Sequence, residues 1–201
     1  MNLGTDTFHD PLASNDVGTK PELRAFLPGT DKSKPTGSDS TNRGNFVLAM
    51  RAAVTGVNLV TTDGPGGRFG LTVSAMCSVS ADPPMLLVCI NRKSPIAPAI
   101  EFNRVFCINA LATGQGRLAR IFAGAAEHGT AYDFDAGTWE RGATDAPRLT
   151  RATASFDCHV ENAYRAGSHS IFIGRVAAAV SRKATPLLYN NQRYGIPLAC
   201  E

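Results

Sequence analysis

The spacing of apolar side chains divides the chain near residue 44 and predicts a structured body beyond that point. Between residues 46 and 54, apolar residues recur at the spacing of one helix face. The members of this face are Phe46, Ala49, Met50 and Ala53. Asn45 is suited to cap the first turn and Gly56 to end the helix. The body is therefore expected to begin with a short amphipathic helix.

Later stretches alternate between strand-like and helix-like patterns. Residues 57–62 and 68–75 are rich in β-branched residues and flank a glycine-rich turn, which predicts a hairpin. Apolar runs predict further strands at 85–90, 105–111, 152–160 and 170–180, with a short strand from Pro186. Helices are expected over 95–102, with Ser94 as the N-cap and Pro95 in the first turn, and over 116–123.

The order of these elements indicates the fold class. Six or seven strands and three short helices are expected. The strands follow one another through hairpins more often than through helices, and this favours antiparallel pairing. The predicted fold class is mainly β with flanking helices, arranged as an antiparallel barrel and not as a doubly wound parallel sheet.

Residues 1–44 have a different composition from the body. They contain four prolines, five glycines and 11 charged residues, and their apolar residues follow no regular period. Such a segment cannot bury enough apolar surface to offset the entropy of ordering it. We therefore expect a flexible N-terminal tail over 1–44 and one folded domain over 45–201.

Composition and charge exclude several classes of protein. The net charge of +3 is too small and too scattered to indicate nucleic-acid binding. No apolar run reaches the 18 residues of a membrane-spanning helix, and the N-terminus does not resemble a signal peptide. Five cysteines, most of them within apolar stretches, indicate reduced and buried thiols in a cytoplasmic protein. No metal-ligand spacing and no nucleophile elbow is found.

Hydroxyl side chains recur along residues 71–80, at Thr72, Ser74, Ser78 and Ser80. In a single strand these four positions would share one face. A row of hydroxyls among small residues suits a planar polar ligand that lies against the backbone. An ordinary amphipathic strand with its hydroxyls in solvent fits the pattern equally well.

Three other segments also allow two interpretations. The stretch 64–70 is best explained as a hairpin loop, because Phe69 replaces the third glycine of the dinucleotide fingerprint and a strand follows. Residues 91–95, Asn-Arg-Lys-Ser-Pro, suit either an anion site or an exposed basic turn. His169 begins an apolar strand, either at the mouth of the barrel or as a hydrogen-bonded structural histidine.

In their order along the chain, these segments resemble the short-chain flavin reductase family, the reductase components of two-component flavin-dependent monooxygenases. The resemblance rests on Gly-Leu-Thr-Val-Ser-Ala at 70–75, Ser-Val-Ser-Ala-Asp-Pro-Pro at 78–84 and Gly-Ser-His-Ser-Ile-Phe-Ile-Gly at 167–174. It covers about residues 45–195 and leaves the tail outside. It implies a split β-barrel of the FMN-binding type that forms a homodimer.

The resemblance also implies an activity and a cofactor. NADH or NADPH would transfer a hydride to FMN or FAD, and the reduced flavin would diffuse to a partner monooxygenase. Two other functions stay open: a flavin- or haem-binding split barrel without activity, and a reductase that passes electrons through flavin to another acceptor such as a corrinoid. His169 separates the enzyme from the pure binder, which needs no histidine facing the nicotinamide.

Finally, the resemblance implies roles for individual residues. The residues that would lie along the isoalloxazine and continue its site are Thr72, Val73, Ser74, Ala75, Ser78, Val79 and Ser80. The residues that would hold the phosphate end or close over the flavin tail are Asn91, Lys93, Ser94 and Phe122. His169 would be the catalytic residue on the nicotinamide side, and Tyr194 would pack at the same mouth.

Overall fold

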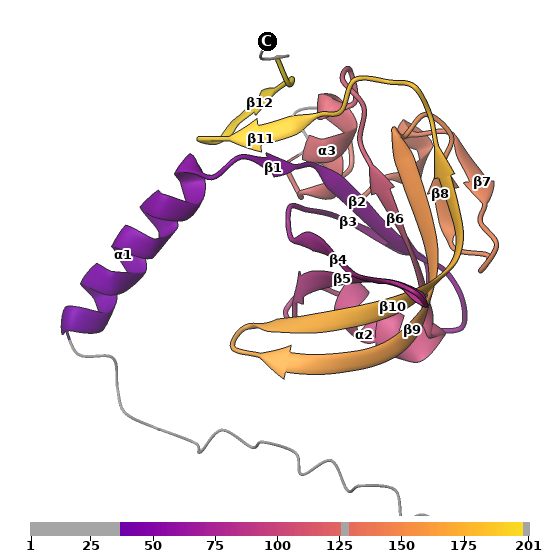
Figure 1. Ribbon diagram of the computed structural model, residues 1–201, viewed down its shortest axis with the longest axis horizontal. Coiled ribbons are helices and arrows are strands. Elements are labelled where there is room, and N and C mark those ends of the chain that lie inside the picture. The colour runs from indigo at the N-terminus through magenta and orange to yellow at the C-terminus, as the bar shows by residue number, and fades with distance from the viewer. Residues whose placement is uncertain (1–36, 126–128, 199–201) are drawn as a thin grey trace, which may run out of the picture.

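A seven-stranded antiparallel sheet forms the body of the protein in the computed structural model, which describes residues 37–125 and 129–198. The strands pair in the order β3-β2-β6-β9-β10-β5-β4 and curve into a barrel (Figure 1). Their bounds are β2 Asn58–Thr62, β3 Phe69–Val73, β4 Met76–Ala81, β5 Pro84–Asn91, β6 Val105–Ala110, β9 Ala154–Ala166 and β10 His169–Ser181. The edge strands β3 and β4 are consecutive and do not pair, so the barrel is split beside the bend that joins them.

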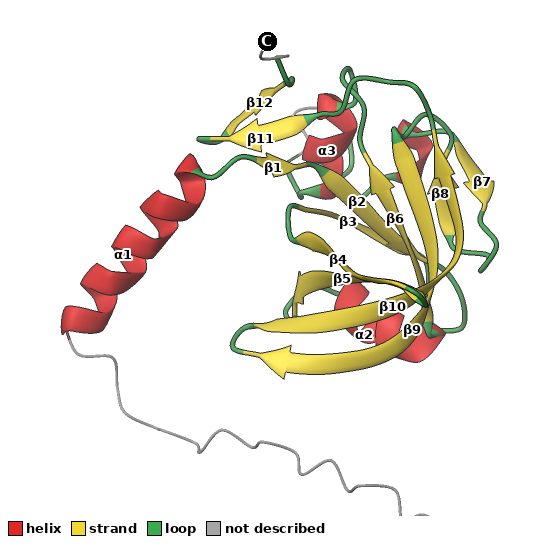
Figure 2. Cartoon of the chain, in the orientation of Figure 1, coloured by secondary structure: helices red, strands yellow, loops and turns green. Residues whose placement is uncertain are grey.

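Two smaller sheets and three α-helices complete the described chain. One sheet contains β1 Thr55–Gly56, β11 Leu188–Asn190 and β12 Arg193–Gly195, and the other contains β7 Trp139–Arg141 and β8 Pro147–Leu149. The helices are α1 Gly37–Ala52, α2 Ile96–Asn103 and α3 Gly116–Phe122, with a short 3-10 turn at Phe134–Ala136. Figure 2 shows α2 and α3 beside the barrel and α1 projecting away from it.

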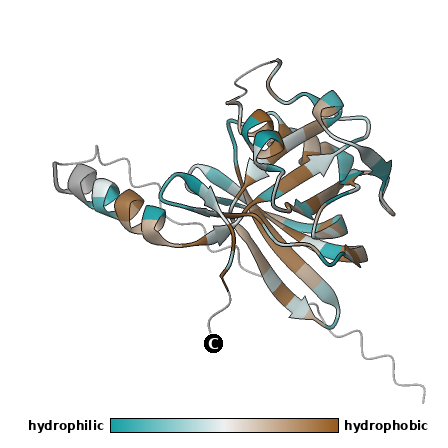
Figure 3. Cartoon of the chain, turned by 90° about the horizontal axis from the view of Figure 1, so that it is seen from above, coloured by the Kyte–Doolittle hydropathy of each residue, from teal (hydrophilic) through white to brown (hydrophobic). Residues whose placement is uncertain are grey.

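The core has two parts. Inside the curved sheet, Val88, Phe106 and Phe172 have no exposed surface and pack with the aliphatic residues of β5 and α2. Between the sheet and α3, a second cluster surrounds Leu59 and Phe122. Hydrophobic positions are concentrated in the strands of the barrel and also occur on α1, outside it (Figure 3). The predicted fold class, mainly β with antiparallel strands and flanking helices, is confirmed.

Several predicted boundaries are wrong. The first helix begins at Gly37 and not at Asn45, and Phe46 and Met50 on its predicted buried face are 63% and 52% exposed. The second helix starts at Ile96, and its N-cap is Pro95 and not Ser94. Strands β9 and β10 together run from 154 to 181 as one long hairpin, because strand pairing continues past the apolar stretch to Ala166.

Some strands were not predicted at all. These are β1, β7, β8 and β12, while the residues of β4 were considered only as a continuation of the strand before them. Each of the four is only two or three residues long, and the sheet supplies the pairing that local composition does not indicate. Within the described residues, no helix is long and apolar enough to cross a membrane.

The cysteines differ in their burial. Cys107 and Cys158 are buried as expected, whereas Cys77 is exposed on the edge strand β4, which corrects its predicted burial. These three cysteines and Cys89 are all free thiols. Cys200 lies outside the described residues.

Candidate active site

The run of hydroxyls at 71–80 is divided by a bend. Strand β3 ends at Val73 and β4 begins at Met76, with exposed Ser74 and Ala75 between them. The Met76 amide donates to the Ser74 carbonyl at 3.1 Å, which closes the bend. A register shift on β4 between Ser78 and Ser80 interrupts the alternation a second time. The predicted single row of hydroxyls on one face is therefore wrong.

A cavity of about 190 Å³ lies where β3 reaches this bend. Its lining residues are Gly56, Val57, Thr72, Val73, Ser74, Ala123, Tyr189 and Tyr194. The Thr72 hydroxyl donates to the Ala119 carbonyl of α3 at 2.9 Å, so this side chain is oriented by the helix. The structure thus brings Thr72, Val73 and Ser74 together with Tyr194, which the resemblance had placed at the mouth near His169.

Two tyrosines form one wall of this cavity. The rings of Tyr189 and Tyr194 lie 5.6 Å apart between centroids on the paired strands β11 and β12. Burial raises the pKa of the Tyr194 phenol, so this group is neutral at physiological pH. Aromatic and aliphatic walls beside a bend of the backbone suit a flat, partly polar ring.

The second cluster of predicted residues lies at the end of β5. His169, the first residue of β10, pairs with Asn91, the last residue of β5. The Asn91 side-chain oxygen accepts from the Lys93 amide at 3.0 Å, and the Ser94 amide donates to the Asn91 carbonyl at 2.9 Å. The turn after β5 therefore holds Asn91, Lys93 and Ser94 beside His169.

The β9–β10 turn fixes the position of the histidine. The Arg92 guanidinium donates to the Gly167 carbonyl at 2.6 Å, and the Arg92 amide donates to the Ser168 carbonyl at 3.0 Å. The Ser168 hydroxyl lies 2.9 Å from Nδ1 of His169. His169 is half-buried. Arg92, which the sequence analysis considered only as part of the basic 91–95 segment, thus braces the turn before His169 across 75 residues of sequence.

The bend and the β5 end are close neighbours in the sheet. The Cys89 amide donates to the Ala75 carbonyl at 3.1 Å. Cys89 and Asn91 are two residues apart on β5, a distance of about 7 Å along a strand. The bend therefore lines the cavity at Ser74 and bonds to β5 at Cys89, two residues before the Asn91 that pairs with His169.

Two predicted groups lie elsewhere. Ser78 and Ser80 line a separate cavity of about 210 Å³ with Met76, Met85 and Phe156, and Val79 is 45% exposed. Ser80 bonds only locally, because its hydroxyl donates to the Asp82 carbonyl and accepts from the Asp82 amide. The structure does not bring these three residues into the cavity of Thr72.

Phe122 belongs to the core. Its ring has no exposed surface and lies edge-on to Phe134 and Trp139 at 5.1 and 5.8 Å between centroids. A Cβ at Gly70 would come within 2.6 Å of this ring, so the ring packs directly on the backbone of β3. A role for Phe122 over the flavin tail is therefore not supported, and its contribution is to support the strand that carries Thr72.

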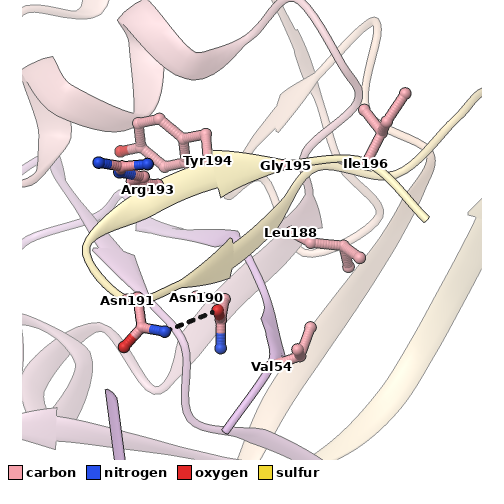
Figure 4. Close-up of a pocket in the computed structure, with 8 residues that line it drawn as sticks. All are labelled: Val54, Leu188, Asn190, Asn191, Arg193, Tyr194, Gly195 and Ile196. Carbon is pink, nitrogen blue, oxygen red and sulfur yellow. Dashed lines mark hydrogen bonds between the residues drawn. The ribbon is translucent and has the colours of Figure 1, made fainter. Parts of the chain in front are cut away.

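Further lining residues were missed by the sequence reasoning. Gly56, Val57 and Ala123 come from segments that were predicted as a helix end, a strand and a helix, and only the fold brings them together. Beyond Tyr194 lies a second, more open cavity of about 580 Å³ (Figure 4). Its walls come mainly from β11, the β11–β12 turn and β12, with Val54 and Ile196 beside them.

The residues present fit a flavin. The wall of the Thr72 cavity suits an isoalloxazine ring, and the turn at Asn91 offers an amide and the Lys93 ammonium to an anionic group. Within the described residues, no cluster of His, Cys, Asp and Glu side chains could hold a metal ion.

Two named relatives are similar to most of this chain. A protein named FMN reductase (NADH) RutF from Variovorax paradoxus is 46% identical over 155 residues, which cover 76% of this chain and 84% of that protein. A protein of the same name from Pantoea ananatis is 39% identical over 182 residues, covering 90% of this chain and 95% of that protein.

Solved structures agree with the fold and the family. The NADH:FAD oxidoreductase SgcE6 of Streptomyces globisporus, in complex with NAD and FAD fragments, matches with a TM-score of 0.71 and 27% identity over 83% of this chain and 98% of its own. The styrene monooxygenase flavin reductase of Pseudomonas putida matches with a TM-score of 0.68 and 27% identity over 78% of this chain and 99% of its own. The split-barrel prediction is confirmed. Residues 50–196 match the family described as flavin reductase like domain, and the chain belongs to this family.

Proposed function

We propose that this protein is an NADH:flavin oxidoreductase that reduces FMN and releases it to a separate monooxygenase. The observation that carries the proposal is a region in which the Ser74–Ala75 bend links the Thr72 cavity to the strand β5, whose last residue pairs with His169. The names of the relatives support the same activity, because those proteins are named FMN reductase (NADH).

The residues of this region divide into three roles. The Thr72–Ala75 segment and Tyr194 would hold the isoalloxazine, and Asn91, Lys93 and Ser94 would take the phosphate end. His169 would orient the nicotinamide. The flavin itself supplies the hydride acceptor when it is bound. The chain has only to hold two rings face to face at reacting distance, and this does not require a nucleophile.

The flavin and nucleotide preferences are also proposed. The relatives that share 46% and 39% identity carry FMN in their names, whereas the structural neighbour SgcE6, at 27% identity, is named for FAD. We therefore expect FMN to be preferred over FAD, and NADH over NADPH. The ratio of kcat/KM for each pair measures both preferences.

The assembly and the location are part of the same proposal. We propose a homodimer with the flavin near its interface, because the family resemblance implies one. The styrene monooxygenase reductase among the structural neighbours supports a monooxygenase as the acceptor of reduced flavin. Four free thiols in the described chain fit a reducing compartment, which supports the cytoplasm as the location.

Stopped-flow reduction of flavin tests the activity. The purified full chain is mixed with each combination of NADH or NADPH and FMN or FAD, and flavin absorbance is followed. Rapid flavin reduction with release of the product is expected. A protein that retains flavin or haem without any reduction by either nucleotide would overturn the proposal in favour of the binder. Faster turnover when a corrinoid is added would show that the corrinoid, and not a monooxygenase, is the final acceptor of the electrons.

A further inference from the structure

The turn that joins β9 to β10 lies beyond the part of the sheet that holds these strands. Strand β9 pairs with β6 only as far as His159, and β10 pairs with β5 only from His169 onward. Residues 161–168 are exposed, and Figure 2 shows the turn at the free end of the hairpin. His169 directly follows this turn, so the surroundings of its ring depend on how the turn is held.

Arg92 supplies two hydrogen bonds to this turn. It is the first residue after β5, and it is exposed. Its guanidinium donates to the Gly167 carbonyl at 2.6 Å, and its amide donates to the Ser168 carbonyl at 3.0 Å. A hydrogen bond from a charged donor is shorter and stronger than one between neutral groups. Both residues that precede His169 are therefore bonded to Arg92.

These bonds reach the histidine ring through Ser168. The Ser168 hydroxyl lies 2.9 Å from Nδ1 of His169, and the carbonyl of the same serine accepts from the Arg92 amide. Gly167 has a φ of 54°, in the left-handed region that favours glycine. The turn thus has one specific backbone conformation, and a shift of it would move the serine hydroxyl away from the ring.

The two cations of the turn after β5 have different surroundings. The Arg92 guanidinium is bonded to a carbonyl of the same chain. The exposed Lys93 ammonium has no hydrogen-bond or ion-pair partner among residues 37–125 and 129–198. An ammonium in these surroundings can meet an anionic ligand, whereas moving the guanidinium to such a ligand would break its bond to Gly167. The contacts therefore assign Lys93 to a ligand and Arg92 to the β9–β10 turn.

We propose that Arg92 is a positioning residue for His169, which it holds in place through the β9–β10 turn without touching flavin or nucleotide. The inference rests on the proposed function, in which His169 orients the nicotinamide. Hydride transfer needs the two rings at reacting distance, and a displaced histidine would let the nicotinamide bind in other orientations. The effect of losing Arg92 should therefore appear in the use of NADH and not in the binding of FMN.

Steady-state kinetics of the full chain, combined with FMN titration, test this role. Arg92→Ala is expected to lower kcat/KM for NADH about tenfold and to leave the dissociation constant of FMN within about twofold. Arg92→Lys is expected to recover most of the activity, because one bond to one carbonyl needs only a charged donor. Arg175→Ala is the matched control, since Arg175 lies on β10 of the same hairpin but bonds to Glu161. It is expected to have wild-type kinetics.

A double variant separates positioning from a general structural role. If Arg92 acts only through His169, adding Arg92→Ala to His169→Gln changes kcat/KM less than about twofold, because residues that act as a unit are not additive. A further loss of about tenfold in that background would overturn the proposal.

Hydrogen exchange of residues 167–169, measured without flavin or NADH, reports on the turn independently of activity. Faster exchange is expected in Arg92→Ala than in the wild type, and unchanged exchange would contradict the proposal even in an active enzyme. A wild type that reduces no flavin would instead overturn the proposed function, and the role of Arg92 with it.

Discussion

At the scale of single residues, His169 is the side chain whose chemistry the proposed reaction needs most. The Ser168 hydroxyl lies 2.9 Å from Nδ1 of its ring, and its backbone pairs with Asn91. We expect His169→Gln to lower kcat/KM for NADH on the order of 100-fold, because misplacing a reactant by about 1 Å has an effect of this size. The dissociation constant of FMN is expected to stay the same.

A matched control keeps this prediction specific. His159 lies exposed on β9 of the same sheet, so His159→Gln is expected to have wild-type kinetics. Steady-state rates and FMN titration are measured on both variants. If His169→Gln weakens FMN binding and NADH use by equal factors, the histidine supports the structure and does not orient the nicotinamide.

Gly142 is required for the packing of a buried carboxylate. A Cβ at this position would coincide with the Asp157 side chain, which is 1% exposed. Gly142→Ala is therefore expected to lower the free energy of unfolding by about 3 kcal/mol, as overpacking of a core does. Gly195→Ala has no atom within 4 Å of its new Cβ and is expected to change stability by less than about 0.5 kcal/mol. Urea denaturation of both variants checks the difference, and equal midpoints would contradict it.

The same carboxylate makes stability depend on pH. Burial raises the pKa of Asp157 above its ordinary value of 3.8, although the nearby Arg148 acts in the opposite direction. The folded protein then binds the Asp157 proton more tightly than the unfolded chain does. The stability present at low pH is lost as the pH rises from 3.8 through the raised pKa.

Asp157→Asn is expected to remove this loss, because the amide does not ionise. Unfolding midpoints of the wild type and the variant are compared between pH 3.5 and pH 7. The stability of the variant relative to the wild type is expected to increase with pH. Asp145→Asn, which changes an exposed carboxylate in a positive-φ position that asparagine tolerates, is the control. If the difference in stability between Asp157→Asn and the wild type is the same at every pH, Asp157 is not the source of the pH dependence.

At the scale of elements, a buried asparagine joins the β7–β8 hairpin to the barrel. The Asn109 side-chain oxygen accepts from the Leu149 amide of β8 at 2.8 Å and from the Ser155 hydroxyl of β9 at 3.0 Å. Its amide donates to the Leu59 carbonyl of β2 at 3.1 Å. Asn109→Ala leaves these buried groups unpaired and is expected to lower the free energy of unfolding by about 3 kcal/mol.

The exposed Asn162 on β9 provides the comparison for this variant. Asn162→Ala is expected to leave the denaturation midpoint nearly unchanged. Hydrogen exchange locates the effect, because faster exchange of the β8 amides is expected in Asn109→Ala. If the exchange of β8 stays slow, the hairpin is held by other contacts.

The elements show how far the sequence predicts the fold. Strands with strong apolar runs, such as β5 and β6, are found within a few residues of their predicted ends. The short edge pieces β7, β8 and β12 depend on pairing partners distant in sequence, which local patterns do not show. For the site, the family resemblance of the ordered motifs predicted roles for Thr72 and His169, and these roles stay predictions. It could not show that Phe122 is turned into the core, because only the packing of α3 against β3 determines that orientation.

At the scale of the whole molecule, the exposure of α1 bears on whether the chain folds alone or together with a second copy. Its apolar face is suited to packing, yet the barrel of the same chain leaves it exposed. If the native unit is a dimer, unfolding also separates two chains, and stability then rises with protein concentration. A monomer of the same fold has no such dependence.

The melting temperature should therefore increase with the concentration of the wild-type chain. Each tenfold rise adds about 1.4 kcal/mol to the dimer, which corresponds to a few degrees for a domain of this size. Phe46→Asp/Met50→Asp, which places two charges in the apolar face of α1, is expected to melt at one temperature at all concentrations, while Phe102→Asp, at an exposed phenylalanine of α2, keeps the wild-type slope. Scanning calorimetry over a hundredfold range measures all three. If the melting temperatures of the wild type and of Phe46→Asp/Met50→Asp rise equally with concentration, the contacts that join two copies lie outside α1.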